Sequence, residues 1–121
     1  MIYSFEKLRV WQKSKHLVKF VYRITSKFPN EEKYGLTSQL RRAAVSVSSN
    51  IAEGSARKSQ KEKRRFYNIA YGSLIEVLNQ LLIAQELDYL NGEKIKIIRS
   101  NISEISWMLT SLYKTTGEEM S

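Results

Sequence analysis

The sequence contains no cysteine, one proline and five glycines in 121 residues. Without cysteine there is neither a disulfide framework nor a thiolate metal site, and such a composition is typical of a reducing cytoplasm. The N-terminal segment lacks the apolar run of a signal peptide. No apolar stretch approaches the roughly 20 residues that cross a bilayer. We therefore expect a cytoplasmic protein without a membrane partner.

Acidic residues are scarce in the first half of the chain. Residues 1–65 contain 16 of the 20 basic residues but only five of the twelve acidic ones, while residues 66–121 carry a small negative charge. The net charge of the whole chain is +8. Such an uneven distribution steers the basic side toward nucleic acid or another polyanion. The alternative is a net charge that serves solubility alone.

The few prolines and glycines leave room for long helices. Apolar residues at helical spacing predict four helices. The first covers about residues 5–27, the second begins near residue 31 and ends between residues 54 and 57, and the third covers residues 59–87. A break at 88–92 precedes the fourth, which is predicted to end before Gly117. Ser59 and Glu62 form a predicted capping box at the start of the third helix. Long helices with short connections predict one all-α domain over residues 1–121, an up-down-up-down antiparallel four-helix bundle.

The second predicted helix carries two stripes. One is apolar and small: Leu40, Ala44, Val47, Ile51 and Gly54. The other is polar: Gln39, Arg42, Ser46, Asn50 and Glu53. With few solvating charge pairs, this pattern predicts a helix enclosed on most sides, in a bundle whose outer surface is also contacted.

We expect the polar stripe to form a structural network with Glu76 of the third helix. Buried polar groups need partners, and Glu76 lies at a height where it can pair with Arg42 or Asn50. The network would set the register of the helices or of subunits. Two alternatives remain, a binding site or a Glu53–Glu76 carboxylate pair for acid–base chemistry.

Basic residues gather around the second break. In an up-down bundle this connection lies at the same end as the N-terminus, so the basic residues near the start of the chain are expected beside it. The predicted nucleic-acid-binding residues are Lys7, Arg9, Lys13, Arg57, Lys58, Lys61, Lys63, Arg64 and Arg65. Clustered cations favour phosphate backbones because each contact releases condensed counterions.

Three tyrosines lie close to these cations in the sequence. Tyr3, Tyr67 and Tyr71 offer rings on which unpaired bases stack, a common feature of single-stranded RNA binding. The alternative is a solvated loop with core tyrosines. The basic face of the first helix, which contains His16 and Phe20, is a second candidate for nucleic-acid contact, but we favour its interpretation as a charged solvent face.

The sequence offers no set of residues for catalysis. Di-iron bundles use Glu-x-x-His pairs, and the single histidine, His16, has no such partner. Ser46, Ser48 and Ser49 have no neighbouring histidine and aspartate that would activate a nucleophile. We therefore expect no catalytic residue, no metal, no cofactor and no enzymatic activity.

Several motifs together resemble one family. They are the opening Phe5, Leu8, Val10, Trp11, Gln12 and Lys13, the blocks 39–46 (QLRRAAVS) and 49–54 (SNIAEG), and the segment 70–76 (AYGSLIE). Across nearly the whole chain they resemble the four-helix-bundle proteins encoded in 23S rRNA intervening sequences. Related proteins are accessory variability subunits of diversity-generating retroelements, pentameric rings with basic surfaces that engage RNA or DNA and a reverse transcriptase. The resemblance implies a homopentamer.

Two functions follow from these observations. The first is a non-enzymatic oligomeric module that binds RNA or DNA through a basic surface. The second is a protein-interaction scaffold or accessory subunit for a partner such as a reverse transcriptase, contacted through exposed apolar residues such as Trp107 and Tyr113.

Overall fold

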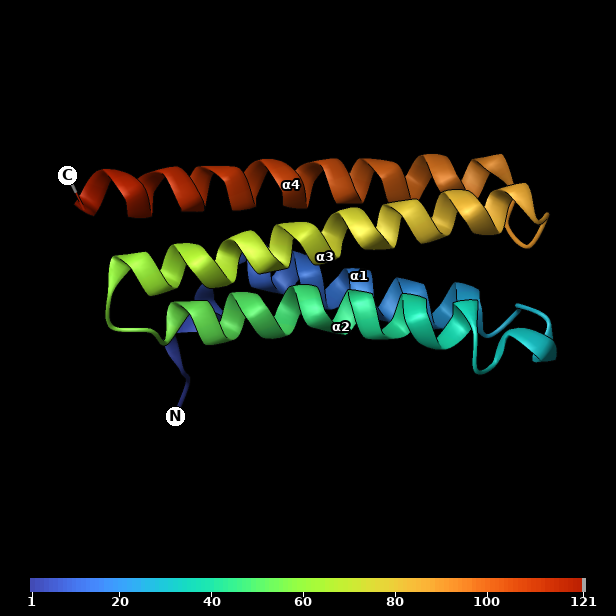
Figure 1. Ribbon diagram of the computed structural model, residues 1–121, viewed down its shortest axis with the longest axis horizontal. Coiled ribbons are helices and arrows are strands. Elements are labelled where there is room, and N and C mark those ends of the chain that lie inside the picture. The colour runs from blue at the N-terminus through green and yellow to red at the C-terminus, as the bar shows by residue number, and fades with distance from the viewer. Residues whose placement is uncertain (121) are drawn as a thin grey trace.

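The computed structural model describes residues 1–120, with side chains through Thr116. Within that range the α-helices are α1 (Arg9–Thr25), α2 (Leu36–Ser55), α3 (Gln60–Glu86) and α4 (Gly92–Met120), and no strand occurs. The 3-10 helices η1 (Ser4–Lys7) and η2 (Asn30–Glu32) precede α1 and α2. The four long helices run alternately up and down (Figure 1). The predicted all-α antiparallel four-helix bundle is confirmed.

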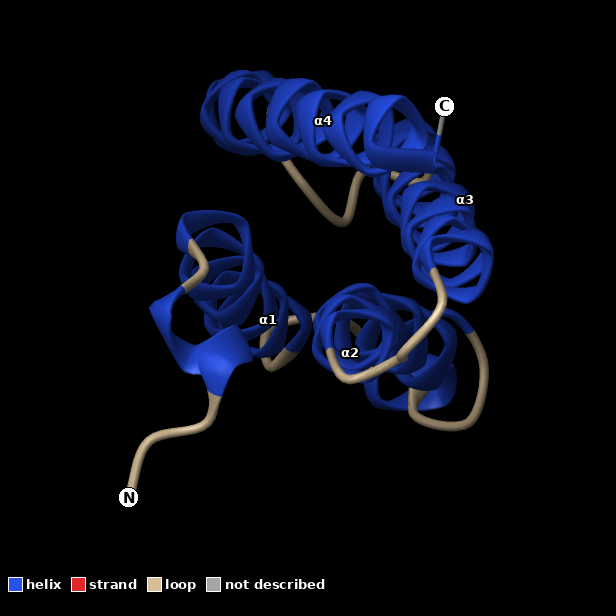
Figure 2. Ribbon diagram, turned by 90° about the vertical axis from the view of Figure 1, so that its left-hand side faces the viewer, coloured by secondary structure: helices blue, strands red, loops and turns tan. Residues whose placement is uncertain are grey.

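Each helix buries the apolar face that its spacing predicts. The fully buried side chains include Leu17 and Val21 of α1, Leu40, Val47 and Ile51 of α2, Leu74, Val77 and Leu81 of α3, and Ile98, Ile105 and Leu109 of α4. The view along the bundle shows α1 beside α2, α2 beside α3 and α3 beside α4 (Figure 2). Among the four long helices, the contact between α1 and α4 is the smallest of the pairs that touch. The bundle is therefore less tightly closed along this seam.

The first predicted helix is interrupted near its start. Leu8 is extended, with φ −71° and ψ 124°, and separates η1 from α1. The carboxylate of Glu6 accepts a 2.8 Å hydrogen bond from the Tyr3 amide, and Gln12 Nε2 donates a 2.9 Å bond to the Glu6 carbonyl. The Glu6 carbonyl thus accepts from a side chain, whereas in a continuous helix it would accept from the amide of residue 10, and the Glu6 carboxylate caps the start of η1. The prediction of one helix from residue 5 was wrong for this reason.

The second helix begins later than predicted. Glu31 and Glu32 belong to η2, and Gly35 follows with φ −111° and ψ −115°, outside helical geometry. Glu32 Oε1 accepts a 3.1 Å hydrogen bond from the Leu36 amide, which takes the place of an N-cap. The Glu32 carboxylate therefore lies one turn before α2, whereas the sequence placed it within the first turn of the helix.

The ends of α3 and the start of α4 agree with the sequence prediction, but the end of α4 does not. Ser59 is the N-cap of α3, and the chain breaks between Glu86 and Gly92. Asn91 Oδ1 accepts a 2.9 Å bond from the Lys94 amide at the start of α4. The predicted stop at Gly117 was wrong, because α4 continues to Met120. Glycine weakens a helix but keeps its backbone donor, so it does not by itself end one.

Candidate nucleic-acid interface

The predicted cations come from parts of the chain that meet at one end of the bundle. The start of the chain and the connection between α2 and α3 lie at this end (Figure 1). η1 also contacts α2. We give the name cationic end to the nine predicted cations that these segments carry: Lys7, Arg9, Lys13, Arg57, Lys58, Lys61, Lys63, Arg64 and Arg65. Lys13 lies farther along α1 than Lys7 and Arg9 and faces α4. Six of them are exposed, while Lys13, Lys63 and Arg64 are half-buried.

Three of these cations already have polar partners. Lys63 Nζ donates a 2.8 Å hydrogen bond to the carbonyl of Ser55, the last residue of α2. Lys13 forms a 3.2 Å ion pair with Glu104 of α4. Because a positive charge beside the carbonyl end of a helix is stabilising, Lys63 has a structural role that the sequence did not reveal.

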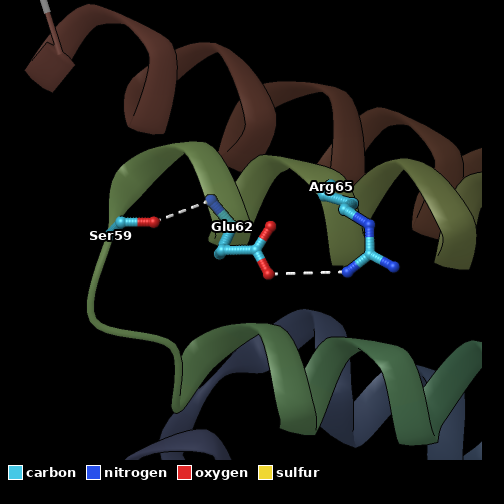
Figure 3. A network of polar contacts seen from close by, with 3 residues as sticks. All are labelled: Ser59, Glu62 and Arg65. Atoms are coloured by element: carbon cyan, nitrogen blue, oxygen red, sulfur yellow. Dashed lines mark hydrogen bonds and ion pairs between the residues drawn. The ribbon is translucent and has the colours of Figure 1, made fainter.

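The third partnered cation, Arg65, lies in the first turns of α3. Ser59 Oγ accepts a 3.1 Å bond from the Glu62 amide, as the capping box predicts. The Glu62 carboxylate reaches Arg65 instead of returning to the Ser59 amide, and its Oε1 lies 3.5 Å from an Arg65 guanidinium nitrogen (Figure 3). Only half of the predicted box is therefore formed. The ion pair is exposed, so it neutralises Arg65 weakly.

The arginines of the cationic end lie over aromatic rings. The guanidinium carbons of Arg57 and Arg65 lie 4.6 Å and 5.4 Å from the centre of the Phe66 ring. Arg64 lies 5.9 Å from the centre of the Tyr113 ring. A ring face attracts a cation without neutralising it. These contacts restrain the arginine side chains while their charges stay available for an anion.

The predicted tyrosines separate into two groups. Tyr3 and Tyr71 are exposed, whereas Tyr67 is 4% exposed and packs in the core. An added Cβ at Gly54 would lie 2.8 Å from Tyr67 Cε1, so the ring fits closely against α2. For Tyr67 the alternative of a core residue holds. From the sequence we expected Tyr113 to contact a protein partner, but its ring lies beside Arg64.

A second cationic surface follows the seam between α1 and α4. A groove of about 380 Å³ is lined by Lys13, His16, Leu17, Lys19, Phe20, Arg23, Asn101 and Ile105. Its cations come from α1, which contains no acidic residue. The sequence did not reveal this groove, and the interpretation of the face as a charged solvent face stays a prediction.

The polar stripe of α2 flanks the contact with α3. The hydroxyls of Ser46 and Ser73 lie 2.8 Å apart, and Asn50 Nδ2 donates to the Ser46 carbonyl and hydroxyl at 2.8 Å and 3.0 Å. Ser73 is buried, while Ser46 and Asn50 are half-buried. This cluster joins the two helices near their midpoints. Its partner Ser73 was missed, although it lies seven residues before Gln80 on the same face of α3.

The other members of the predicted network are exposed. Gln80 Nε2 lies 3.4 Å from Gln39 Oε1 and 3.2 Å from Glu76 Oε2. Glu76 therefore bonds to Gln80 rather than to Arg42 or Asn50. Arg42 and Glu53 point to solvent, and no described contact joins Glu53 to Glu76. In the single chain the stripe is thus an open face with one half-buried cluster, and its covering by another subunit stays a prediction.

Two further features of the described residues bear on function. No three histidine, aspartate or glutamate side chains lie close enough together to hold a metal ion. None of the described helices combines the length and the apolar character needed to cross a membrane.

Comparison with known proteins supports the fold of the chain. A solved protein of unknown function from the S23 ribosomal protein family of Bacteroides thetaiotaomicron VPI-5482 has a TM-score of 0.80 and 24% identity, covering 87% of this chain and 98% of that one. At this identity the likeness shows the fold alone. No curated protein matches the chain. The sequence model described as 23S rRNA-intervening sequence protein matches residues 6–111. Because that match spans most of its length, the chain belongs to the family of 23S rRNA-intervening sequence proteins.

Proposed function

We propose that this protein is a non-enzymatic module that binds single-stranded RNA or DNA through its cationic end. The observation that carries the proposal is the group formed by Arg57, Lys58 and Lys61, which are exposed and have no ion pair among the described residues. Lys7 and Arg9 extend the same surface from the start of the chain. No chemistry is assigned to the chain, and no cofactor is required.

The electrostatics predict a strong dependence on salt. Each phosphate contact to a single strand lowers the slope of log K against log salt by about 0.7. If about five cations contact phosphates, affinity falls roughly 100-fold between 50 mM and 200 mM salt. A surface whose cations were neutralised by carboxylates would show little of this dependence.

The experiment compares two variants with the same change in net charge. Arg57→Glu with Lys58→Glu reverses two exposed cations of the cationic end. Lys96→Glu with Arg99→Glu reverses two exposed cations near the start of α4. The start of this helix lies at the end of the bundle opposite the α2–α3 connection (Figure 1). Fluorescence anisotropy with a labelled single-stranded RNA measures both.

We expect the first variant to lose more than about 10-fold in affinity and the second to lose far less, because only the first removes direct phosphate contacts. Equal losses would mean that net charge alone attracts the RNA. No binding by the unmodified protein at 50 mM salt would overturn the proposal.

We also propose that the protein self-associates, as the resemblance to pentameric proteins implies. What supports this is a set of exposed apolar residues along α3 and at its C-cap: Ile69, Ile75, Ile83 and Leu87. Large apolar side chains exposed along one helix are typical of an interaction surface when they gather into a patch. Light scattering with size-exclusion chromatography tests it. A monomer at micromolar concentration would contradict the homopentamer, and Ile83→Lys should weaken the assembly.

One observation favours a second function, that of an accessory subunit for another protein such as a reverse transcriptase. Trp107 is 71% exposed on α4, and exposed tryptophan is typical of protein-binding hot spots. Co-purification with that partner should survive high salt and be lost in Trp107→Ala. Loss of the complex in salt instead would point back to RNA as the bridge.

A further inference from the structure

A small aromatic hollow lies between α3 and α4 at the cationic end. It measures about 190 Å³ and is lined by Tyr67, Asn68, Tyr71, Leu109, Thr110 and Tyr113. Tyr71 and Tyr113 are 39% and 40% exposed, so their rings form accessible walls above the apolar base. The side chains of Asn68 and Thr110 are exposed polar groups within reach of the same space. The hollow thus combines ring faces with a few hydrogen-bonding groups.

A cationic hollow adjoins it. This second space measures about 220 Å³ and is lined by Lys61, Arg64, Arg65, Asn68 and Tyr113. Because Asn68 and Tyr113 line both hollows, the two hollows are adjacent, and together we call them the depression. None of its lining residues is acidic. The depression is therefore aromatic on one side and positively charged on the other.

Arg64 connects the two parts. Its guanidinium lies over the Tyr113 ring, and its Nε is buried without a hydrogen-bond partner among the described residues. Because the described residues give the guanidinium no carboxylate partner, it keeps its full charge, which favours an anion beside it. Contact with Tyr113 holds this guanidinium at the border between the cationic and the aromatic hollow.

We infer that this depression binds one unpaired nucleotide of a single strand. The base stacks on Tyr113 and Tyr71, its edge bonds to the Asn68 amide, and its phosphate lies among Lys61, Arg64 and Arg65. The inference rests on the proposed function and names the part of the surface that accepts a base. A duplex is excluded from this mode because its bases cover each other's faces, whereas an unpaired base offers a free face to an aromatic ring.

The test measures stacking separately from charge. The probes are a labelled single-stranded 12-mer RNA and the same strand with abasic residues throughout. The variants are Tyr113→Ala, Tyr113→Phe, which keeps the ring, and Trp107→Ala, which removes an exposed ring of α4 that does not line the depression. Thermal unfolding of each variant checks that the bundle is intact.

We expect Tyr113→Ala to weaken RNA binding about 10-fold, the scale of one base stacked on one ring, with the salt slope unchanged. Tyr113→Phe and Trp107→Ala should bind like the unmodified protein. The abasic strand should bind the unmodified protein and Tyr113→Ala equally. RNA containing 4-thiouridine should crosslink on irradiation to peptides that contain Tyr71 or Tyr113.

The failure of this inference is distinct from failure of the proposed function. If RNA binds with the expected salt dependence but Tyr113→Ala has no effect, or the crosslinks map elsewhere, the nucleotide site is wrong and the RNA-binding function stands. Equal weakening of the abasic strand by Tyr113→Ala would also overturn the site, since no base would be stacked there.

If the unmodified protein does not bind RNA, a free nucleotide separates the two proposals. Adenosine monophosphate is titrated while the tyrosine ring signals are followed by NMR. Shifts at Tyr71 and Tyr113 would retain the nucleotide site without the RNA function. Unchanged signals would remove both.

Discussion

The guanidinium of Arg41 on α2 lies over the ring of Tyr22 on α1, 4.5 Å from its centre. Arg41 Nε also donates a 2.9 Å hydrogen bond to Thr25 Oγ1, and its terminal nitrogen lies 3.4 Å from the Tyr22 carbonyl. One side chain therefore contacts a ring, a hydroxyl and a helix-end carbonyl. It ties the last turn of α1 to α2 across the connection that contains η2.

Arg41→Lys should lower the free energy of unfolding by about 1 kcal/mol. Lysine keeps the charge but loses the planar stack and the directed Nε bond. Urea unfolding followed by circular dichroism measures the change. Arg42→Lys is the matched control, because Arg42 is the exposed neighbour and has no described hydrogen bond. A similar loss in both variants would show that the fork geometry of Arg41 is unimportant.

Gly54 and Gly72 predict opposite outcomes for the same substitution. An added Cβ at Gly54 would lie 2.8 Å from Tyr67 Cε1 and 2.9 Å from Phe66 Cβ, whereas nothing lies within 4 Å of one at Gly72. Gly54→Ala should therefore destabilise the bundle by about 1–3 kcal/mol through overpacking. Gly72→Ala should stabilise it by about 0.5–1 kcal/mol, since alanine is the better helix former.

Thermal unfolding measures both glycine variants, and each is the control for the other. If Gly54→Ala were as stable as the unmodified protein, α2 and α3 would not be as close as the structure places them. A loss in Gly72→Ala would instead indicate that another subunit packs against this exposed part of α3, which would support self-association.

The fold was predictable because many residues determine it together. Burial of Val21, Leu40 and Ile98 follows from spacing repeated over a whole helix, and one deviating residue changes little. The starts of α1 and α2 were not predictable in the same way. They depend on single hydrogen bonds of the Glu6 and Glu32 carboxylates, which a pattern of apolar residues does not contain.

The candidate site shows the same division. The order of the helices placed Lys7 beside the connection between α2 and α3, so the cationic end could be predicted from the topology alone. The sequence could not show which cations lack partners, because Lys63 and Lys13 are bonded to Ser55 and Glu104, which belong to other helices. Tyr113 could not be assigned to the site from the sequence, because it lies on α4, far along the chain from Lys61 and Arg64. Only the packing of α4 against α3 brings it beside them.

Tyr89 should be the source of a pH effect at alkaline pH. Its hydroxyl donates a 2.9 Å hydrogen bond to Glu32 Oε2. This bond, loss of solvent and the negative charges of Glu32 and Glu31 raise the pKa of Tyr89 above the ordinary 10.0. The Tyr89 hydroxyl therefore loses its proton at a higher pH in the folded protein than in the unfolded chain. Its contribution to the free energy of unfolding is complete below pH 10 and is lost as the pH rises through the raised pKa.

Glu32→Gln tests this effect. Glutamine keeps an oxygen for the Leu36 amide but removes the charge, so we expect the pKa of Tyr89 to fall toward the ordinary value. Ultraviolet titration of tyrosinate, with Tyr89→Phe to identify the signal, measures the shift. The fall in unfolding free energy above pH 10 should also be shallower in Glu32→Gln. An unchanged titration curve would show that the carboxylate does not control this phenol.

Lys61 and Lys63 are two residues apart yet should have different functions. Lys63 donates to the last carbonyl of α2, whereas Lys61 is exposed and lines the cationic hollow. Lys63→Met keeps the apolar stem but loses the charged hydrogen bond, so unfolding free energy should fall by about 1 kcal/mol. Lys61→Met should change stability by less than about 0.5 kcal/mol, as is usual for an exposed position.

RNA binding should show the reverse order. Lys61→Met removes a free cation, so it should weaken binding and make the salt slope shallower by about 0.7. Lys63→Met should leave the slope nearly unchanged, because the ammonium group is already engaged with the Ser55 carbonyl. Urea unfolding and anisotropy titrations on the same two proteins measure both quantities. If Lys63→Met altered the salt slope as much as Lys61→Met, the bond to Ser55 would have to open when RNA binds, and Lys63 would belong to the binding surface after all.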